Sequence, residues 1–289
     1  ASAGTPPSPT DDTPVCARVF STNDTHGRLF PAEYPWSEGR LVGGSAVMAG
    51  YVREAREAEP DCPLFVASGG DMMQGTLISN LKDGASTIRL FNAIGYDVAA
   101  IGNHEFDWGI AVLEQRMAQA DFPMLGANIY VEGTDEHPEW ARPWAIVEKN
   151  GVRVGFVGAT TRSTPVTTRP ANVTGLEFRS IAEALDRYIP EVRAAGADFV
   201  VAVMHEGGFC DEGVCRGEAI EALEAATVRF DYAVTGHTHS RIATRIHGAP
   251  VVQSYANSTA YGLGRLERAP GGQVRAELLG VRPTFADEV

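Results

Sequence analysis

The sequence predicts an α/β fold with mixed sheets. Short apolar runs of strand length alternate with segments whose apolar residues recur at helical spacing, and this alternation is typical of α/β proteins. Three segments are also expected to form antiparallel hairpins, so the sheets should be mixed rather than purely parallel. The sequence contains neither an internal repeat nor a linker after Pro14. We therefore predict one domain over residues 15–289.

Seven apolar runs are predicted as strands. In chain order they are ARVFS, LFVAS, VAAIG, PMLGANI, RVGFVGA, FVVAVMH and YAVTGH. Helical spacing is found over residues 44–58, 87–94, 110–120, 181–195 and 218–226. The segment WAIVEKNGVRVGFVG contains Asn150-Gly151, a signal for a type I′ hairpin turn. The segments RIATRIHGAPVVQSY and GRLERAPGGQVRAELLGV are predicted as further antiparallel pairs.

The composition limits the classes of function. The chain has 289 residues, of which 44% are hydrophobic and 21% are charged, as in an ordinary globular protein. Since its apolar stretches are shorter than the roughly eighteen residues of a membrane span, no span is predicted. The formal net charge of −13 argues against nucleic-acid binding and against an anionic membrane surface. Small anions can still bind, because a metal ion reverses the local potential.

The N-terminal segment and the cysteines bear on location. Residues 1–14, ASAGTPPSPTDDTP, contain no large apolar residue and are predicted as a disordered leader. Such a segment remains after a signal peptide is removed, and a trimmed chain looks the same. We predict disulfides Cys16–Cys62 and Cys210–Cys215, with four reduced thiols as the alternative. The disulfides favour an extracytoplasmic location, secreted or periplasmic.

Side chains that bind metals or move protons gather where predicted strands end. The segments are Asn23-Asp24-Thr25-His26-Gly27, Gly69-Gly70-Asp71, Gly102-Asn103-His104-Glu105, Met204-His205 and Gly236-His237-Thr238-His239. In an open α/β sheet, ligands bind beyond the carboxyl ends of the strands, so all five segments are expected to converge. One such segment alone is more often a structural turn; five in order make that reading improbable. Of the two other histidines, His137 is expected at the surface and His247 at a hairpin turn, without a functional role.

These residue types suit hard-to-borderline divalent metals, because they offer carboxylates, imidazoles and an amide oxygen but no thiolate. Two ions about 3.5–4 Å apart form a clamp that hydrolytic phosphoryl transfer uses. Asp71 follows two glycines that allow a tight turn, and its two oxygens can bridge two ions. The expected ligands are Asp24, His26 and His239 for one ion and Asn103, His205 and His237 for the other, with Asp71 between them.

The ordered set NDTHG, GGD, GNHE, a strand-terminal His and GHTH resembles the calcineurin-like metallophosphoesterase superfamily. More narrowly, TNDTHGRL and FNAIGYDVAAIGNHEFDWG resemble the N-terminal catalytic domain of secreted 5′-nucleotidases and 2′,3′-cyclic-nucleotide phosphodiesterases. The resemblance extends from Asn23 to His239. It implies a four-layer α/β/β/α sandwich of two mixed sheets, the metallophosphoesterase fold, over residues 15–289.

The resemblance implies the same metal ligands and adds two catalytic residues. His104 would face the substrate phosphate rather than a metal, and Asp107 would bond to its far nitrogen. Glu105 would either tune a ligand from behind or cap the following helix, and it is the acid least expected to touch the chemistry. The two divalent ions could be zinc, manganese, iron or cobalt.

The implied reaction is hydrolysis of phosphate esters, with nucleoside 5′-monophosphates as the first choice. One alternative is hydrolysis of 2′,3′-cyclic nucleotides or of phosphodiesters in general. Another is a non-catalytic metal-binding module, and the complete ligand set argues against this last alternative. The expected partner is therefore a small phosphate ester, a nucleotide. Full-length 5′-nucleotidases carry a further C-terminal domain that binds the substrate, and this sequence stops at LLGVRPTFADEV. That domain is expected to be missing, through truncation or in a minimal form.

Overall fold

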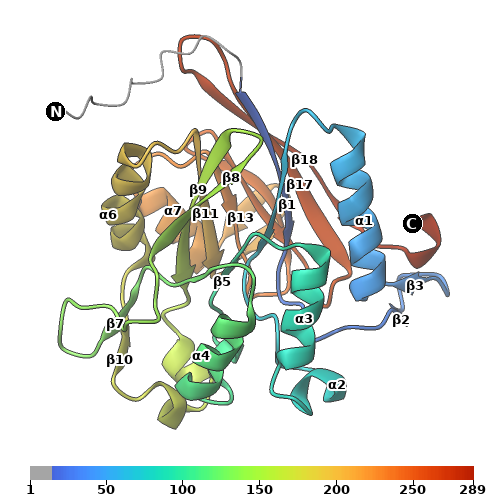
Figure 1. The fold of residues 1–289 in the computed structure, drawn as a ribbon, viewed down its shortest axis with the longest axis horizontal. Helices are drawn as coiled ribbons and strands as arrows, with labels where there is room; N and C mark the ends of the chain where they lie inside the picture. Colours follow the sequence, from blue (N-terminus) through green and yellow to red (C-terminus); the bar gives the residue numbers. More distant parts are fainter. Residues whose placement is uncertain (1–14) are drawn as a thin grey trace, which may run out of the picture.

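Two six-stranded sheets form the centre of the protein (Figure 1). The structure, a computed structural model, describes residues 15–289, and the leader predicted over residues 1–14 lies outside the described residues. Both sheets contain parallel and antiparallel neighbours. The prediction of an α/β fold with two mixed sheets is confirmed.

In the first sheet, four parallel strands are extended by an antiparallel pair. The order is β18 (Val274–Pro283), β17 (Ala260–Arg268), β1 (Val15–Thr22), β4 (Leu64–Ser68), β5 (Val98–Ala100) and β6 (Met124–Leu125). Strands β1, β4, β5 and β6 run parallel, and β17 runs antiparallel to both β1 and β18. The carboxyl ends of the parallel strands therefore lie at one edge of this sheet.

The second sheet has a parallel centre and an antiparallel strand at each side. Its order is β15 (Arg241–Ile246), β16 (Ala249–Ser254), β14 (Tyr232–Val234), β11 (Phe199–His205), β9 (Val152–Thr160) and β8 (Trp144–Lys149). The predicted hairpin joins β8 to β9, where Asn150 and Gly151 have φ of 51° and 78°. Positive φ at both central residues is what a type I′ turn requires.

The sheets pack face to face, and helices cover their outer faces. Phe65 and Phe156 belong to an apolar cluster between the sheets, with ring centroids 6.3 Å apart. The helices α1 (Ser45–Ala58), α3 (Ala85–Ile94) and α4 (Ile110–Gln119) pack on the first sheet, and α6 (Ile181–Ala194) and α7 (Glu218–Ala225) on the second. Figure 1 shows α1 and α3 on the right and α6 and α7 on the left. Each of these five helices begins and ends within two residues of its predicted bounds, because its apolar stripe meets a sheet.

The prediction of one strand over PMLGANI is wrong. The segment divides into β6 and β7 (Ile129–Val131), which belong to different sheets. Asn128 is fully buried between them, and its amide nitrogen and oxygen pair with the backbone of Thr160 at 2.7 and 2.8 Å. This side chain satisfies backbone groups that a ladder partner would otherwise take, so the chain leaves the first sheet after β6 and pairs again with β10 (Leu176–Phe178).

Several short elements lie in the connections and were not predicted. They are the strand pairs β2 (Ala32–Glu33) with β3 (Leu41–Val42) and β12 (Phe209–Asp211) with β13 (Val214–Arg216), the helices α2 (Leu77–Asn80) and α5 (Thr164–Thr167), and the 3₁₀ turns over His104–Phe106, Pro170–Val173 and Ala286–Glu288. These elements are too short to show a hydrophobic period.

Both predicted disulfides are present. Cys16 in β1 is bonded to Cys62, which lies just before the neighbouring parallel strand β4, with Cα atoms 5.4 Å apart. Cys210 and Cys215 are bonded across β12 and β13. Over residues 15–289, each helix is too short or too polar to cross a membrane.

Candidate metal centre

The five predicted segments converge where the two sheets meet. Strands β1, β4 and β5 lead into the first three segments, and β11 and β14 lead into the last two. Hydrogen bonds between segments of the two sheets hold these five segments together. Nδ1 of His205 donates to the carbonyl of Gly69 at 2.8 Å, and the backbone N–H of His237 donates to Asp24 Oδ2 at 2.9 Å. The convergence expected from the strand ends is confirmed.

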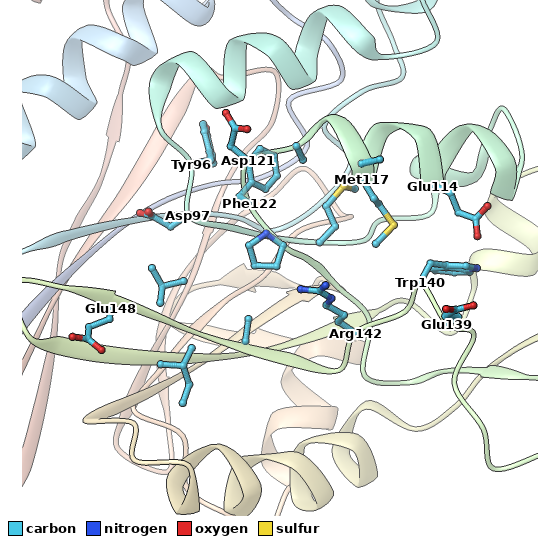
Figure 2. A pocket seen from close by; sticks show the side chains of 17 residues that line it. Tyr96, Asp97, Glu114, Met117, Asp121, Phe122, Glu139, Trp140, Arg142 and Glu148 are labelled. Carbon is cyan, nitrogen blue, oxygen red and sulfur yellow. The ribbon is translucent and has the colours of Figure 1, made fainter.

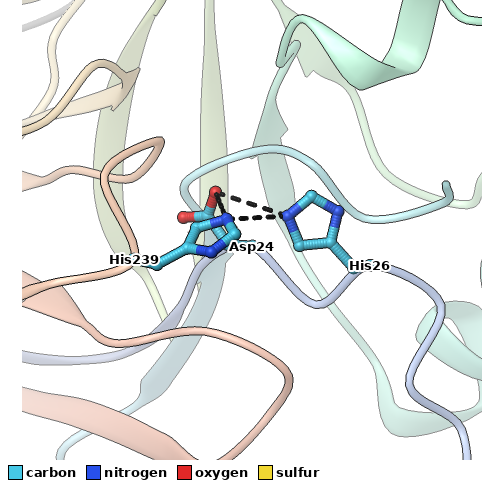
Figure 3. A group of neighbouring side chains, drawn as sticks. All are labelled: Asp24, His26 and His239. Atoms are coloured by element: carbon cyan, nitrogen blue, oxygen red, sulfur yellow. Dashed lines mark hydrogen bonds and ion pairs between the residues drawn. The ribbon is translucent and has the colours of Figure 1, made fainter. Parts of the chain in front are cut away.

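Asp24, His26 and His239 form the first group of donor atoms, which all lie within 4.8 Å of one another (Figure 3). Nε2 of His239 is 3.2 Å from Asp24 Oδ1 and 2.9 Å from Nε2 of His26. Asp24 is fully buried and His26 nearly so, whereas the side chain of His239 is 48% exposed. We call this set the outer group.

Asp71, His205 and His237 form a second group, again with donor atoms within 4.8 Å. Nε2 of His205 lies 3.1 Å from Asp71 Oδ2 and 3.0 Å from Oδ1 of Asn103, so the predicted amide joins the same cluster. His205 is fully buried and Asp71 is 1% exposed. We call this set, with Asn103, the inner group.

Asp71 lies between the two groups. Its Oδ2 is 3.1 Å from Nε2 of His205 in the inner group and 3.9 Å from Nε2 of His26 in the outer group. Gly102 makes room for it, because a Cβ at that position would lie 2.1 Å from Asp71 Oδ1. A carboxylate in this position is placed to bridge two cations.

The donor chemistry of both groups fits divalent metal ions. His26 and His205 each donate from Nδ1 to a backbone carbonyl, of Gln74 and Gly69, at 2.8 Å. In a neutral ring the lone pair is then on Nε2, the atom that faces the carboxylates. A bond from the other ring nitrogen to a carbonyl is the usual way in which proteins orient a histidine ligand.

The backbone at the candidate ligands is strained. Five of them have positive φ, a conformation that is uncommon outside glycine and costs roughly 1–3 kcal/mol per residue. They are Asp24 (49°), His26 (50°), Asp71 (51°), His237 (73°) and His239 (54°). Such outliers concentrate at functional sites, where the surrounding structure fixes them. The fold therefore holds these side chains in place at a cost in stability.

Charge in the inner group shifts its pKa values in opposite directions. Burial alone would lower the pKa of His205, but the charge and hydrogen bond of Asp71 raise it to about 10. Burial, followed by the charge of His205, lowers the pKa of His237 to about 4. The buried carboxylate of Asp71 thus requires positive charge beside it, which a metal cation supplies as well as a proton does.

His104 and Asp107 lie beside the two groups. Nδ1 of His104 is 2.7 Å from Asp107 Oδ2, and this hydrogen bond is the largest cause that raises the pKa of His104 to about 9. The ring centroids of His104 and His26 are 5.3 Å apart, and the backbone N–H of His104 donates to Asp71 Oδ1 at 3.0 Å. The predicted pairing of His104 with Asp107 is present, and His104 belongs to neither group of donors.

Glu105 holds two of the site's loops together. It is fully buried, and Oε2 accepts the N–H groups of Asp71 and Gly102 at 2.8 and 2.7 Å while Oε1 accepts that of Met72 at 2.8 Å. Burial, followed by the charge of Asp71, raises its pKa to about 7. The alternative that Glu105 caps the following helix is wrong, because Gly109 is the N-cap of α4 and no side chain caps it.

Other positioning residues were not predicted. Asp107 is held from outside by Thr168, whose hydroxyl donates to its Oδ1 at 2.7 Å. Asn23 donates from Nδ2 to Asp24 Oδ2 at 2.7 Å and accepts from the N–H of Ser254 at 2.7 Å. Asn23 directly precedes the first candidate ligand, Asp24, and this position in the sequence is a local signal for its role. Thr168 lies 61 residues after Asp107 in the chain, so nothing local pointed to it.

The remaining histidines lie away from the site. His137 is only partly exposed, and its ring bonds to the carbonyl of Ile129 and the hydroxyl of Tyr188 at 2.6 and 2.5 Å. It joins two elements instead of being a free surface residue, so that expectation was wrong. His247 lies at the turn between β15 and β16, as expected, and is exposed.

A large cavity lies outside the site. It measures about 910 Å³ and is lined by residues around β6 and β8, the edge strands of the two sheets (Figure 2). Its rim includes Asp97, Glu114 and Glu148. None of the predicted site residues lines this cavity. Although it is large, it is therefore separate from the candidate metal centre.

Sequence comparisons agree with this geometry. Residues 62–253 match the family model described as bacterial capsule synthesis protein PGA_cap. Protein UshA of Escherichia coli is 35% identical over 209 residues, which cover 72% of this chain and 37% of UshA. The snake venom 5′-nucleotidase of Gloydius brevicauda is 31% identical over 234 residues, 78% of this chain and 37% of the relative.

Solved structures with a similar fold include proteins of the same kind. A Staphylococcus aureus protein described as a 5′-nucleotidase superposes with a TM-score of 0.79 at 27% identity, over 94% of this chain and 55% of that protein. The calcineurin-like phosphoesterase YfkN of Bacillus subtilis shares the fold, with a TM-score of 0.77 at 23% identity over 96% of this chain and 93% of that one.

The chain belongs to the PGA_cap family and to the 5′-nucleotidase branch of the calcineurin-like metallophosphoesterases. As a member of this branch it is expected to use divalent metal ions, and the outer and inner groups are the two candidate ligand sets in its described residues. The chain spans 37% to 45% of the length of the first two curated relatives.

Proposed function

We propose that this metallophosphoesterase hydrolyses phosphate esters, nucleoside 5′-monophosphates above all, with two divalent metal ions. The observation that carries the proposal is the pair of donor groups with Asp71 between them and His104 beside them. Two relatives named 5′-nucleotidase, from snake venom and from Vibrio cholerae, support the choice of substrate.

Each group holds one ion in this proposal. The ligands are Asp24, His26 and His239 in the outer group and Asn103, His205 and His237 in the inner group, with Asp71 shared. When bound, two such ions neutralise phosphoryl oxygens and lower the pKa of a water molecule toward neutrality. Zinc, manganese, iron and cobalt all accept these ligands. The protein's part is to fix the donors, which the strained backbone and the carbonyl bonds of His26 and His205 do.

His104 acts on the substrate phosphate. Its Nδ1 is bonded to Asp107, so Nε2 is the nitrogen that can donate a hydrogen bond to a phosphoryl oxygen or to the leaving alkoxide. Asp107 orients the ring and stabilises its charged form. Thr168 in turn holds Asp107. An acidic protein can bind a phosphate dianion here because the local charge is positive once cations are present.

Phosphodiester hydrolysis is the second candidate. The 2′,3′-cyclic-nucleotide 2′-phosphodiesterase/3′-nucleotidase of Haemophilus influenzae is 30% identical over 268 residues, 86% of this chain and 40% of that protein. The same donor groups suit a cyclic diester, so substrate preference depends on what surrounds them. We also propose a secreted or periplasmic location, which the two disulfides favour.

The test is a substrate panel. Phosphate release is measured from AMP, 2′,3′-cyclic AMP, nitrophenyl phosphate and bis(nitrophenyl) phosphate with added manganese, zinc, cobalt or iron(II). The proposal expects AMP to be the best substrate and chelation to abolish turnover. A preference for the cyclic diester would favour the second candidate. Absence of turnover with all four esters at saturating metal would favour a non-catalytic metal-binding module.

A further inference from the structure

A smaller cavity opens directly beside the outer group. It measures about 470 Å³, within the range of small-molecule pockets, and His239 forms part of its wall. Nε2 of His239 lies 3.2 Å from Asp24 Oδ1. A phosphate ester bound at the donor groups would therefore have this cavity within reach of its organic part.

Aromatic side chains line this cavity. Tyr34 and Trp36 stack with ring centroids 5.8 Å apart and an interplanar angle of 23°, and Tyr255 lines it as well. Trp36 and Tyr255 are 51% and 45% exposed, a large exposure for such residues. Exposed aromatic faces beside a ligand site favour stacking on planar rings, and every nucleobase offers such a face.

The segment that carries Trp36 is anchored on both sides. The hydroxyl of Ser37 bonds to the backbone N–H of Tyr34 at 3.0 Å and to the carbonyl of Arg40 at 2.7 Å. The rings of Trp36 and Phe285 meet edge to face with centroids 6.1 Å apart. These contacts reduce the entropy lost when Trp36 stacks on a ligand.

Tyr255 is tied to the metal-binding segments themselves. Its N–H donates to the carbonyl of Ser240 at 2.9 Å, directly after His239 in the chain, and its carbonyl accepts from Asn23 Nδ2 at 2.6 Å. Tyr255 and Asn257 both have positive φ, 55° and 58°.

Arg241 supplies a polar group at the same wall. It follows His239 by two residues, is exposed, and forms no ion pair with any residue from 15 to 289. A guanidinium without a carboxylate partner can bond to ring nitrogens, carbonyl groups or a ribose hydroxyl. The cavity thus combines two exposed rings with one cationic donor.

We propose that this cavity binds a planar ring carried by the ester's leaving group, the nucleobase of a nucleotide, with Trp36 and Tyr255 as its stacking surfaces and Arg241 at the ring's polar edge. The inference rests on the proposed phosphate-ester hydrolysis for its place in the reaction. It goes beyond that function, because it assigns base recognition to this chain's own catalytic domain.

The experiment compares two esters that both release a primary 5′-alkoxide of ribose. AMP carries the ring and ribose 5-phosphate does not. Steady-state kinetics are measured for Trp36→Ala, Trp36→Phe and Tyr255→Ala, with Trp144→Ala as the matched control on the edge strand β8. We expect kcat/KM for AMP to fall about tenfold in Trp36→Ala and Tyr255→Ala, mostly through KM. The value for ribose 5-phosphate should stay unchanged, and Trp36→Phe should retain most of the preference for AMP.

Equal losses on both esters, or no loss on AMP, would overturn the inference and favour a role of these rings in contacts with another protein surface. A second measurement is independent of turnover. Adenosine, which has no phosphate, is titrated into the protein, and its affinity should fall about tenfold in Trp36→Ala but not in Trp144→Ala. The wild type could release no phosphate from either ester and still bind adenosine with an affinity that depends on Trp36. In that case the proposed hydrolysis would be wrong, and the assignment of the cavity would stand.

Discussion

The outer and inner groups are built from similar side chains but differ in exposure. In the inner group, His205 is fully buried and Asp71 almost so, and Nε2 of His205 lies 3.1 Å from Asp71 Oδ2. In the outer group, the side chain of His239 is 48% exposed. A buried carboxylate must be paired with a positive charge, whereas exposed donors are satisfied by water. We infer that the inner group belongs to the protein's core and that the outer group exchanges with solvent on the side of His239, its one exposed donor.

Because the donors differ in exposure, we expect their replacement to have different effects on folding stability and on metal content. Removal of an inner donor should change folding stability as well as metal content, because its partners are left unsatisfied in the interior. Removal of His239, the exposed donor of the outer group, should change metal content with little effect on stability. Measurements of both quantities on the same variants therefore test the comparison directly.

The largest effect is expected for Asp71→Asn. The amide removes the charge shared by the two groups, so both ions should be lost and kcat/KM for AMP should fall about a thousandfold or more. Metal content, measured by mass spectrometry after dialysis, should drop from two ions per chain to less than one. A variant that kept both ions would contradict the bridging position of Asp71.

A fall of about a hundredfold or more in kcat is expected for His104→Gln, because this residue is proposed to act on the phosphate and not on a metal. Its metal content should match the wild type. Asp107→Asn is the companion variant, and it should lower kcat less, since the ring remains but its orientation and charge are weakened. Loss of an ion from His104→Gln would show that His104 is a ligand.

Much of the donor set could be predicted from sequence, for a physical reason. Asp24, Asp71, Asn103 and His205 each stand at or just after the end of a parallel strand, and such ends meet at one edge of a sheet. Strand ends are marked locally by an apolar run followed by glycine or polar residues. The disulfide between Cys16 and Cys62 was predictable for the same reason, because β1 and β4 are adjacent and parallel.

Contacts between connections were not predictable in this way. The role of Glu105 depends on the backbone of Asp71 and Met72, more than thirty residues earlier in the chain. The cavity beside His239 combines Trp36 with Tyr255, whose segments show no period and whose meeting depends on packing in the whole domain. Sequence therefore predicts the candidate ligands better than the groups that position them or the walls of the cavity beside them.

Glu105→Gln should have an intermediate effect. The amide can accept hydrogen bonds through one atom only, so at least one buried N–H of Asp71, Gly102 or Met72 loses its partner. We expect metal affinity to fall by about 10–100-fold and the free energy of unfolding to fall by about 1–3 kcal/mol. Metal titration and chemical denaturation measure the two quantities. Unchanged values in both would show that Glu105 does not hold the loops.

The smallest effect is expected for His239→Asn, with His237→Asn as its matched inner partner. Both replacements put an amide where an imidazole stood, but His239 is about half exposed and water can complete the outer group after its loss. In His239→Asn, the affinity for one ion should fall about tenfold. This variant should keep the wild-type unfolding midpoint and should regain most of its activity at high metal concentration. His237→Asn should unfold more easily and recover less. The reverse order would mean that exposure does not decide which ion exchanges, and that the outer group is the more firmly held one.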